Sequence, residues 1–512
     1  MISIMVGINA SADTFEYEGL CYRTLMGNKV EVVHWRYGAL PYERLVKDGK
    51  LSIPETVFYN GDEYTVVQIG ESAFYKLENV IECEIPKTIV SIGESAFYYD
   101  YTLEKISFPE GLISIGTHAF GNTKLSSLNL PNSLTTINES AFIGTQINEL
   151  VIPNSVTFIG KAAFSSCKNL TKVVIGSGVS EIEEYPFIYC YNLSSIIVNE
   201  DNENFCSENN TLYTKDKKGI ICVAPNQTGE YIMPNSVTSI EKAAMEYTNF
   251  YSIKISENLS LISGGCFSNC NNLIAVIVPE SVTYIDSDAW ERCSHLKSIV
   301  FGKNVLNIVT DVVKQNTELE NIFCFSTRPP VINDYTFDET HFIYSTLYVP
   351  ESALDRYKDH KIWSKFRNIK GLSEDKAKFI PMESISFEYD KLVIGRNEVL
   401  NANYSISPEY VTVPYLKWES SNPNIATVKE GKITGISEGY CTITAYSVDG
   451  SGLKASFEVE VKDNAGIDDA LDEPESETVE YYNIHGIKLM QPTKGVNIVK
   501  YKDGTVRKVY NR

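Results

Sequence analysis

The sequence lacks any long hydrophobic run. Although 43% of its 512 residues are hydrophobic, no apolar stretch approaches the roughly 20 residues that a transmembrane helix needs. Residues 1–12 form a short apolar stretch ending in Ala10-Ser11-Ala12, which fits a signal-peptidase site but lacks the usual preceding basic segment. Either the natural start lies upstream or the stretch is not a signal. We interpret it as the remnant of a signal peptide and expect an exported protein with no transmembrane span.

Positive charge is also in short supply. The chain has 45 Lys and Arg against 66 Asp and Glu, a formal net charge of −21. A phosphate backbone would be repelled by such a surface rather than neutralised, so we expect no nucleic-acid partner.

Catalytic and metal-binding motifs are missing. The six histidines are scattered, and the sequence contains no HExxH, no GxSxG and no phosphate-binding glycine loop. Paired carboxylates such as Glu183-Glu184 and Asp468-Asp469 fall in expected turns or linkers, where solvation explains them. The sequence therefore predicts no enzyme, no catalytic residue, no cofactor and no metal site.

Cysteines are too few for a disulfide scaffold. There are eleven, an odd number, and none is in a CxxC pair, which argues against zinc. Cys167, Cys190, Cys270 and Cys293 each follow a repeated aromatic position by three residues, which indicates a small, buried, weakly polar residue. Neighbours such as Cys167 and Cys190 could come within disulfide range, but free thiols are the favoured prediction.

What the chain does contain is a repeat. Ten times an isoleucine is followed five residues later by Phe or a substitute for it, at intervals of 22 or 23 residues with one gap of 58. The pairs are Ile69/Phe74, Ile92/Phe97, Ile115/Phe120, Ile137/Phe142, Ile159/Phe164, Ile182/Phe187, Ile240/Met245, Ile262/Phe267, Ile285/Trp290 and Ile308/Val313. Such a period predicts a solenoid, in which each unit buries its apolar side against the next.

Each unit has three parts. A short strand with alternating apolar residues, as in 170–175, is stopped by Pro or Gly, and a second short extended piece ends at the isoleucine. The segment from there to the aromatic is expected to be a turn or a short helical stretch. Stacking at about 4.8 Å per coil would give a rod on the order of 50 Å with an unbroken apolar core.

The 58-residue gap predicts an insertion over residues 199–233. Its strand-like segments 211–214 and 220–223 flank the turn-forming residues 215–219, as in a hairpin. It is either a decorative loop, which we favour, or a recognition element.

The unit IPNSVTFIGKAAFSSCKNLTKVVI resembles the repeat of the BspA-like leucine-rich-repeat surface proteins of anaerobic bacteria. The resemblance implies a solenoid over residues 55–325, an N-terminal cap over 13–54 and a C-terminal cap over 326–378. Departures are Met245 and Val313 at the aromatic position, and Asn138, Glu183 and Glu241 after the isoleucine.

The period disappears beyond the repeats. Residues 382–462 have short strands every 8 to 12 residues, typical of a β-sandwich, and resemble the bacterial Ig-like domain of group 2. Residues 463–478 are acidic and poor in apolar residues, which predicts a linker. Residues 479–512 are similar to the C-terminal sorting modules of type IX export, although a plain structural tail is the alternative. The predicted fold is thus a β-rich leucine-rich-repeat solenoid of short parallel strands and few short helices, then an Ig-like β-sandwich and a small C-terminal β module.

Two sets of residues are candidates for ligand contact. The outward strand position just before the last core residue is apolar in five coils: Val151, Val174, Ile197, Ile277 and Val300. An exposed apolar stripe can mark a partner surface, although the β-propensity of Val and Ile alone explains it, and we favour that explanation. Tyr98, Tyr99 and Tyr189 follow the repeat aromatic, and tyrosine is common in recognition surfaces.

The resemblance implies adhesion or ligand capture at the bacterial cell surface, on the outer membrane exterior. A protein or glycan ligand, such as host extracellular matrix or another bacterial cell, is the expected partner. The alternative function is a structural spacer or envelope component without a specific ligand site.

Overall fold

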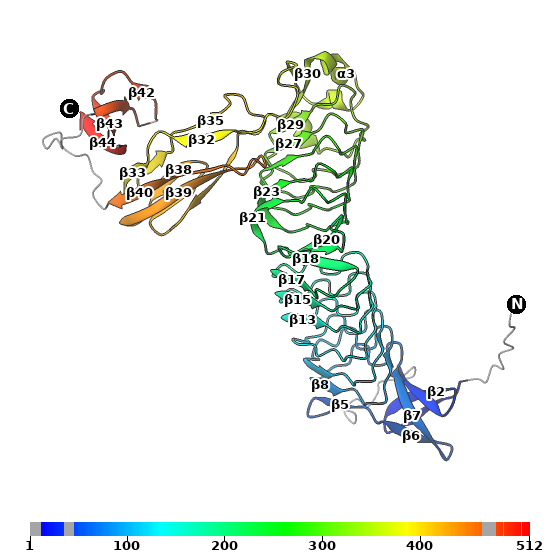
Figure 1. The fold of residues 1–512 in the computed structure, drawn as a ribbon. Helices are drawn as coiled ribbons and strands as arrows, with labels where there is room; N and C mark the ends of the chain where they lie inside the picture. The colour runs from blue at the N-terminus through cyan, green and yellow to red at the C-terminus, as the bar shows by residue number, and fades with distance from the viewer. Residues whose placement is uncertain (1–11, 35–45, 463–477, 485, 503, 512) are drawn as a thin grey trace.

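The computed structural model describes residues 12–34, 46–462, 478–484, 486–502 and 504–511. The chain forms a long, bent stack of coils, and a separate β domain projects sideways from its C-terminal half (Figure 1). The predicted signal remnant and acidic linker lie, but for residues 12 and 478, outside the described residues.

We number the coils 1 to 10 in the order of the ten Ile/aromatic pairs. Each coil has a long-strand side, a short-strand side ending at the isoleucine, and a turn side that carries the aromatic. The long strands of coils in the N-terminal half are β5 (Lys50–Ser52), β8 (Glu82–Glu84), β10 (Lys105–Ser107), β13 (Glu149–Ile152), β15 (Lys172–Ile175) and β17 (Ser195–Val198), and β4 (Val46–Lys47) pairs with β5. The short strands are β9 (Ser91–Ile92), β11 (Ser114–Ile115), β12 (Thr136–Ile137), β14 (Phe158–Ile159) and β16 (Glu181–Ile182).

The C-terminal half repeats this arrangement. Its long strands are β21 (Thr228–Ile232), β23 (Asn249–Lys254), β25 (Ala275–Ile277), β27 (Ser298–Phe301) and β29 (Asn321–Cys324), and its short strands are β22 (Ser239–Ile240), β24 (Leu261–Ile262), β26 (Tyr284–Ile285) and β28 (Asn307–Ile308). Neighbouring coils pair in parallel with equivalent repeat positions opposite one another, for example Ile115 with Ile137. The predicted parallel solenoid is confirmed.

The turn side is not helical. In every coil the third residue after the isoleucine and the second after the aromatic have positive φ, as do His118 (φ 54°) and Asn122 (φ 60°) in coil 3. Two left-handed residues per coil close two successive turns, which brings the chain back to the next long strand without a helix. Of the two alternatives drawn from the sequence, the turn is therefore correct.

The aromatic positions form the core. All ten residues at this position are at most 1% exposed. In coils 1 to 6 the rings stack from coil to coil, with centroids 5.1 Å apart for Phe74 and Phe97 and 5.4 Å apart for Phe142 and Phe164. The ring spacing matches the strand spacing of a parallel ladder, so burial and main-chain pairing reinforce each other.

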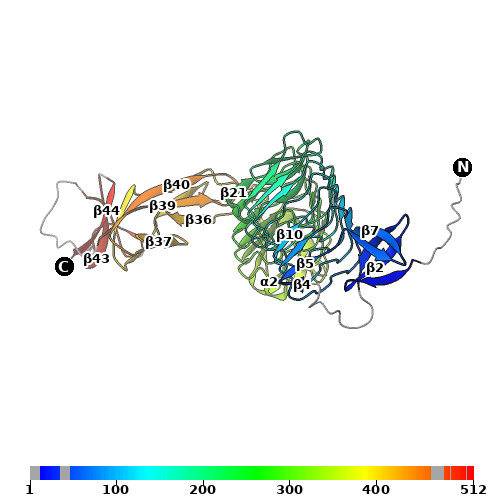
Figure 2. The ribbon, with the colours of Figure 1, turned by 90° about the horizontal axis from the view of Figure 1, so that it is seen from below.

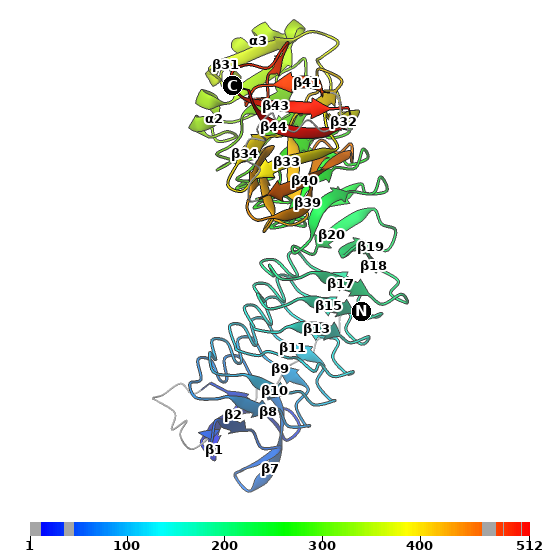
Figure 3. The ribbon, with the colours of Figure 1, turned by 90° about the vertical axis from the view of Figure 1, so that its left-hand side faces the viewer.

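The predicted insertion interrupts the stack of coils, with β18 (Phe205–Glu208), β19 (Thr211–Thr214) and β20 (Gly219–Val223) between its two halves (Figure 3). Strands β19 and β20 form the expected antiparallel hairpin, preceded by β18. Strand β20 then pairs with β22 of coil 7, with Ile220 opposite Ile240, so β22 pairs with β20 rather than with β16 of coil 6. The buried side chains consequently form two clusters that meet at the hairpin, so the prediction of an unbroken core is wrong at this one point.

The repeated cysteines connect coils through their thiols. Cys167 Sγ donates to the carbonyl of Phe142 at 3.3 Å, and Cys293 Sγ to that of Phe267 at 3.2 Å, each in the preceding coil. All eleven cysteines are free, which confirms the favoured prediction. Asn316, at the same position in coil 10, donates through Nδ2 to the Trp290 carbonyl at 3.0 Å and accepts from the Cys293 N–H at 2.7 Å.

Asp100 occupies this buried position in coil 2. Its Oδ1 accepts the Leu77 N–H at 2.5 Å, and Oδ2 has no partner among the described residues. Burial raises the pKa of the Asp100 carboxyl to about 9, so the group is neutral at pH 7. An unfolded aspartate titrates near 3.9, so between these values only the folded chain holds the proton.

We therefore expect Asp100→Asn to stabilise the protein, and increasingly so as pH rises. Stability falls with pH wherever the folded state binds more protons, and asparagine removes that loss while keeping the bond to Leu77. The measurement is urea unfolding of both proteins at about pH 5 and about pH 8. At the higher pH the unfolding free energy of Asp100→Asn should exceed that of the wild type by about 1–3 kcal/mol. An identical pH dependence in both proteins would contradict a neutral Asp100.

Both ends of the stack are closed. At the N-terminus β1 (Thr14–Tyr17), β2 (Leu20–Leu25) and β3 (Lys29–Val33) form an antiparallel meander that joins β7 (Asp62–Ile69), with β6 (Thr56–Tyr59) alongside. At the C-terminus β30 (Thr346–Pro350) and β31 (Asn368–Leu372) extend the long-strand sheet. The connecting helices are α2 (Glu339–Tyr344), η1 (Glu351–Ala353), α3 (Leu354–Lys358) and η2 (Trp363–Lys365).

The β domain begins with β32 (Ser384–Phe387) and extends to β44 (Thr505–Asn511), and its described residues form three sheets. Strands β32 and β35 (Tyr404–Ser407) pair, and β34 (Val399–Asn401), β38 (Lys432–Gly435) and β37 (Ala426–Lys429) form a second sheet. The third, in spatial order, contains β36 (Leu416–Ser420), β39 (Gly439–Ser447), β40 (Lys454–Lys462), β33 (Lys391–Gly395), β44, β43 (Gly495–Tyr501), β41 (Thr478–Tyr482) and β42 (Lys488–Leu489). The C-terminal strands thus share a sheet with residues 391–462 through the β33–β44 pair, rather than forming a sheet of their own.

Candidate binding surfaces

The apolar stripe runs along the long-strand side in strict register. Val151, Val174 and Ile197 lie opposite one another on β13, β15 and β17. The long strands of the C-terminal half form a separate sheet, in which a second row runs through Ile232, Lys254, Ile277, Val300 and Phe323. Ile232 was missed by the sequence interpretation, although like Val151 it stands two residues before a proline.

The first row and the start of the second are open to solvent. Val151 is 58% exposed, Ile197 43% and Ile232 62%, while Val174 between them is half-buried. We call Val151, Val174, Ile197 and Ile232 the free stripe. Val151, Val174 and Ile197 lie in the N-terminal half, and Ile232 lies on β21, the first long strand of the C-terminal half. The strands β13, β15 and β17 lie side by side below the insertion (Figure 3).

Further along, the second row is covered by the β domain. Val300 is 1% exposed, so its prediction as an exposed contact residue is wrong, and Ile277 is half-buried in the same cluster. Val413 and Val448 of the β domain, both fully buried, pack into this cluster with Phe323 and Phe325. The apolar excess in this part of the row did signal a partner, but the partner is in the same chain.

Polar contacts hold the two parts together at the edge of this interface. Lys297 Nζ lies 2.5 Å from Glu430 Oε1, and the Tyr415 hydroxyl donates to Glu320 Oε2 at 2.9 Å. The hydrogen bond with Glu430 raises the pKa of Lys297. The loop between β39 and β40 reaches the solenoid beside β21 and β23, as the view from below shows (Figure 2).

The predicted tyrosines gather in two clusters on the turn side. In coils 1 and 2 the rings of Tyr98 and Tyr99 stack with their centroids 3.9 Å apart. The ring centroids of Tyr75 and Tyr101 lie 6.1 and 5.6 Å from that of Tyr99. Lys76 Nζ lies 5.1 Å from the Tyr75 ring centre. Burial, with a hydrogen bond to Tyr99, raises the pKa of Tyr98 to about 12. Tyr98 and Tyr99 are half-buried by one another, and Tyr101 is the most exposed, at 59%.

The second cluster spans the interruption between coils 6 and 7. The rings of Tyr189 and Tyr191 in coil 6 pack edge-on against the ring of Tyr247 in coil 7, with centroid distances of 5.6 and 4.8 Å. Tyr247 was missed because Met245 replaces the aromatic that marks this position in other coils. Tyr189 is 37% exposed, and burial raises its pKa, with Glu246 adding to the effect.

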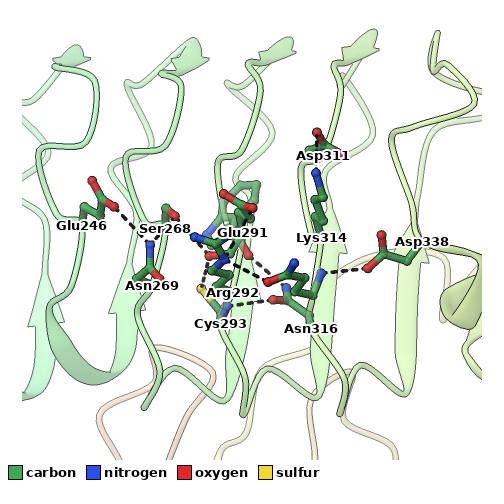
Figure 4. Close-up of polar contacts among 12 residues, drawn as sticks. Glu246, Ser268, Asn269, Glu291, Arg292, Cys293, Asp311, Lys314, Asn316 and Asp338 are labelled. Carbon is green, nitrogen blue, oxygen red and sulfur yellow. Dashed lines mark hydrogen bonds and ion pairs between the residues drawn. The ribbon is translucent and has the colours of Figure 1, made fainter.

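A polar row continues this turn side through coils 7 to 10 (Figure 4). Asn269 Nδ2 donates to Glu246 Oε1 at 3.1 Å, and Arg292 Nε to Gln315 Oε1 at 2.9 Å. Burial raises the pKa of Glu246 to about 7, and the bond from Asn269 opposes this rise. These side chains satisfy one another, so the row stiffens the stack and leaves few groups free for a ligand.

Among the described residues no group of three or more His, Cys, Asp or Glu side chains is placed to hold a metal ion. No helix within the described parts of the chain is long and apolar enough to cross a membrane.

Comparison with known proteins agrees with the coil geometry. The family model described as "BspA type Leucine rich repeat region" matches residues 90–211 and 226–344, in six copies. These two segments are similar to BspA-type leucine-rich repeats. The two matches leave out only residues 212–225 of the inserted region, which contain β20 and most of β19.

A solved structure shares the fold of this chain. The pneumococcal vaccine antigen PcpA has 17% identity and a TM-score of 0.52, with 70% of this chain and 99% of that chain covered. A leucine rich cell surface protein of Faecalibacterium prausnitzii has 22% identity and a TM-score of 0.44, with 61% and 94% covered.

Curated relatives match over short stretches. An uncharacterized protein of Clostridium acetobutylicum is 41% identical over 81 residues, 16% of this chain and 20% of the relative. The chain spans a fifth or less of the length of the curated relatives it matches.

Proposed function

We propose that this BspA-type repeat protein is a secreted or cell-surface protein that captures a protein partner through the free stripe, without catalysis. The observation that carries the proposal is the register of the stripe. In the sheet of the C-terminal half the β domain covers the corresponding strand position at Ile277, which is half-buried, and at Val300, which is buried. This side of the solenoid therefore already serves as a protein-docking face within the chain.

The β domain leaves this face uncovered at β13, β15 and β17 and at Ile232 of β21. Val151, Ile197 and Ile232 are exposed, and polar strand residues such as Lys172 and Glu149 surround them. An apolar centre with a polar rim is the usual composition of a protein interface. Host extracellular matrix or the surface of another bacterial cell are the partners to test first.

The other domains agree with this role. We interpret the β domain as Ig-like, the C-terminal strands as a sorting element and residues 1–12 as a signal remnant, which together would place the protein on the outer membrane exterior. A structural spacer is the second candidate, favoured by the buried interface between solenoid and β domain, which makes a stiff unit. The two differ in whether the free stripe binds anything.

The test is capture of extracellular matrix proteins by the full chain. Val174→Glu with Ile197→Glu places two charges in the centre of the free stripe, and we expect capture to fall at least about tenfold because charges at an interface core must be desolvated. Tyr101→Ala, on the turn side, is the matched exposed control and should bind normally. Equal capture by the double variant would exclude the free stripe, and no capture by the wild type would favour the spacer.

A further inference from the structure

The interruption between coils 6 and 7 opens the main-chain ladder on the turn side. In uninterrupted coils three N–H groups donate to the next coil, as Ser140, Phe142 and Gly144 do to the carbonyls of 161, 163 and 165, each at 2.8 Å. In coil 6 the equivalent groups belong to Tyr185, Phe187 and Tyr189. Among the described residues none of the three has a main-chain acceptor, because β20 takes the place of the expected coil.

A crevice of about 410 Å³ lies at this opening. Its floor is apolar and consists of Ile182 and Ile221. Ile182 is only partly buried, whereas the other nine isoleucines at this position are buried. The insertion therefore uncovers a part of the coil that stacking hides everywhere else.

The rim of the crevice carries both hydrogen-bond donors and acceptors. Lys161 Nζ lies 3.3 Å from Glu184 Oε2 and 5.5 Å from the centre of the Tyr185 ring. Glu183 is already engaged, since its Oε2 accepts the Lys161 N–H at 2.8 Å. The Glu241 carboxylate, across the crevice on coil 7, has no ion pair with any described side chain.

We propose that this crevice binds a neutral saccharide unit of a glycan. A sugar ring has an apolar face that fits Ile182, Ile221 and the Tyr185 ring. Its hydroxyls can donate to Glu184 and Glu241 and accept from Lys161 Nζ and from the open N–H of Tyr185. The volume falls within the roughly 300–1,000 Å³ of small-molecule sites.

The charged side chains of the crevice favour a neutral saccharide over an anionic or a cationic ligand. Three glutamates against one lysine repel an anion, so an acidic sugar or a carboxylate is disfavoured. A cationic side chain would compete with Lys161 for Glu184 and would leave the Tyr185 N–H without an acceptor. A neutral polyol satisfies both kinds of group at once. The adjacent cluster of Tyr189, Tyr191 and Tyr247 offers aromatic area for further units of the glycan.

This site lies on the turn side, away from the free stripe, so its failure and that of the proposed protein-binding face are distinguishable. The test titrates the full chain with galactose, mannose, N-acetylglucosamine and their neutral oligosaccharides, followed by saturation-transfer NMR and calorimetry. Glucuronic acid and a trilysine peptide are the competing probes.

Three variants locate the binding. Glu241→Ala removes a free acceptor, and Tyr185→Asn removes the ring with a residue that tolerates the positive φ of this position. Each should weaken saccharide binding at least about tenfold while melting like the wild type. Glu94→Gln is the control, because Glu94 follows Ile92 by two residues, as Glu184 follows Ile182, but lies in an uninterrupted coil.

Binding of a neutral saccharide that Glu241→Ala and Tyr185→Asn weaken and Glu94→Gln does not would establish the site. The proposal is overturned if no neutral saccharide binds at millimolar concentration, if the variants bind like the wild type, or if only trilysine or glucuronic acid binds.

Discussion

Replacing Phe142 by alanine is expected to destabilise the N-terminal half of the solenoid by about 3–5 kcal/mol. Phe142 is fully buried in the middle of the ring stack, and its ring centroid lies 5.4 Å from those of both Phe120 and Phe164. Removing it leaves a cavity in the close-packed core, and the main-chain ladders on either side hold the neighbouring coils apart. Collapse around the cavity is therefore restricted, which places the expected loss in the upper part of the range.

The measurement is chemical denaturation of the full chain, with the unfolding free energy compared to the wild type. Because each coil contacts only its neighbours, we expect the transition of the N-terminal half to shift while that of the C-terminal half changes little. Ile143→Ala, one residue further along but half-buried, is the matched control and should cost clearly less. A loss below about 1 kcal/mol for Phe142→Ala would show that the coils rearrange freely, contrary to a close-packed stack.

The second large effect is expected for Val300→Glu. Val300 is 1% exposed beneath the β domain, among Val413, Val448 and Phe323. A carboxylate there has no cationic partner in the apolar cluster, and burying it would cost at least about 3 kcal/mol. The protein can avoid this cost by releasing the β domain, since the residue would then face water on a sheet that remains intact.

Small-angle scattering of the full chain should show the release as a larger radius of gyration, and limited proteolysis should cut residues 373–383 faster. Val151→Glu is the matched control, because Val151 has the same place in its strand but is 58% exposed. That variant should keep the wild-type shape and lose only partner capture. If Val300→Glu scatters and digests like the wild type, the β domain does not bury this row.

Much of the fold was predictable because the repeat is local. The positions of Ile92 and Phe97 hold an isoleucine and an aromatic or other apolar residue in every coil, and stacking buries most of them. The periodicity of these positions predicted both the solenoid and the core. The free thiol of Cys167 and the hairpin around residues 215–219 were likewise visible in the spacing and in the turn residues. The site was predicted less well: Val151 and Ile197 are exposed as expected, whereas Val300 is not.

The sequence by itself determined the coil, its register and which side chains lie inside, because each unit contacts copies of itself and the period records those contacts directly. Only the tertiary structure decided which part of the apolar row stays free, since Lys297 meets Glu430 across 133 residues of chain with no repeat to relate them. The crevice beside Ile182 likewise depends on the pairing of β20 with β22 of coil 7. Contacts between surfaces that do not repeat depend on their complementary shapes, and no periodicity encodes these.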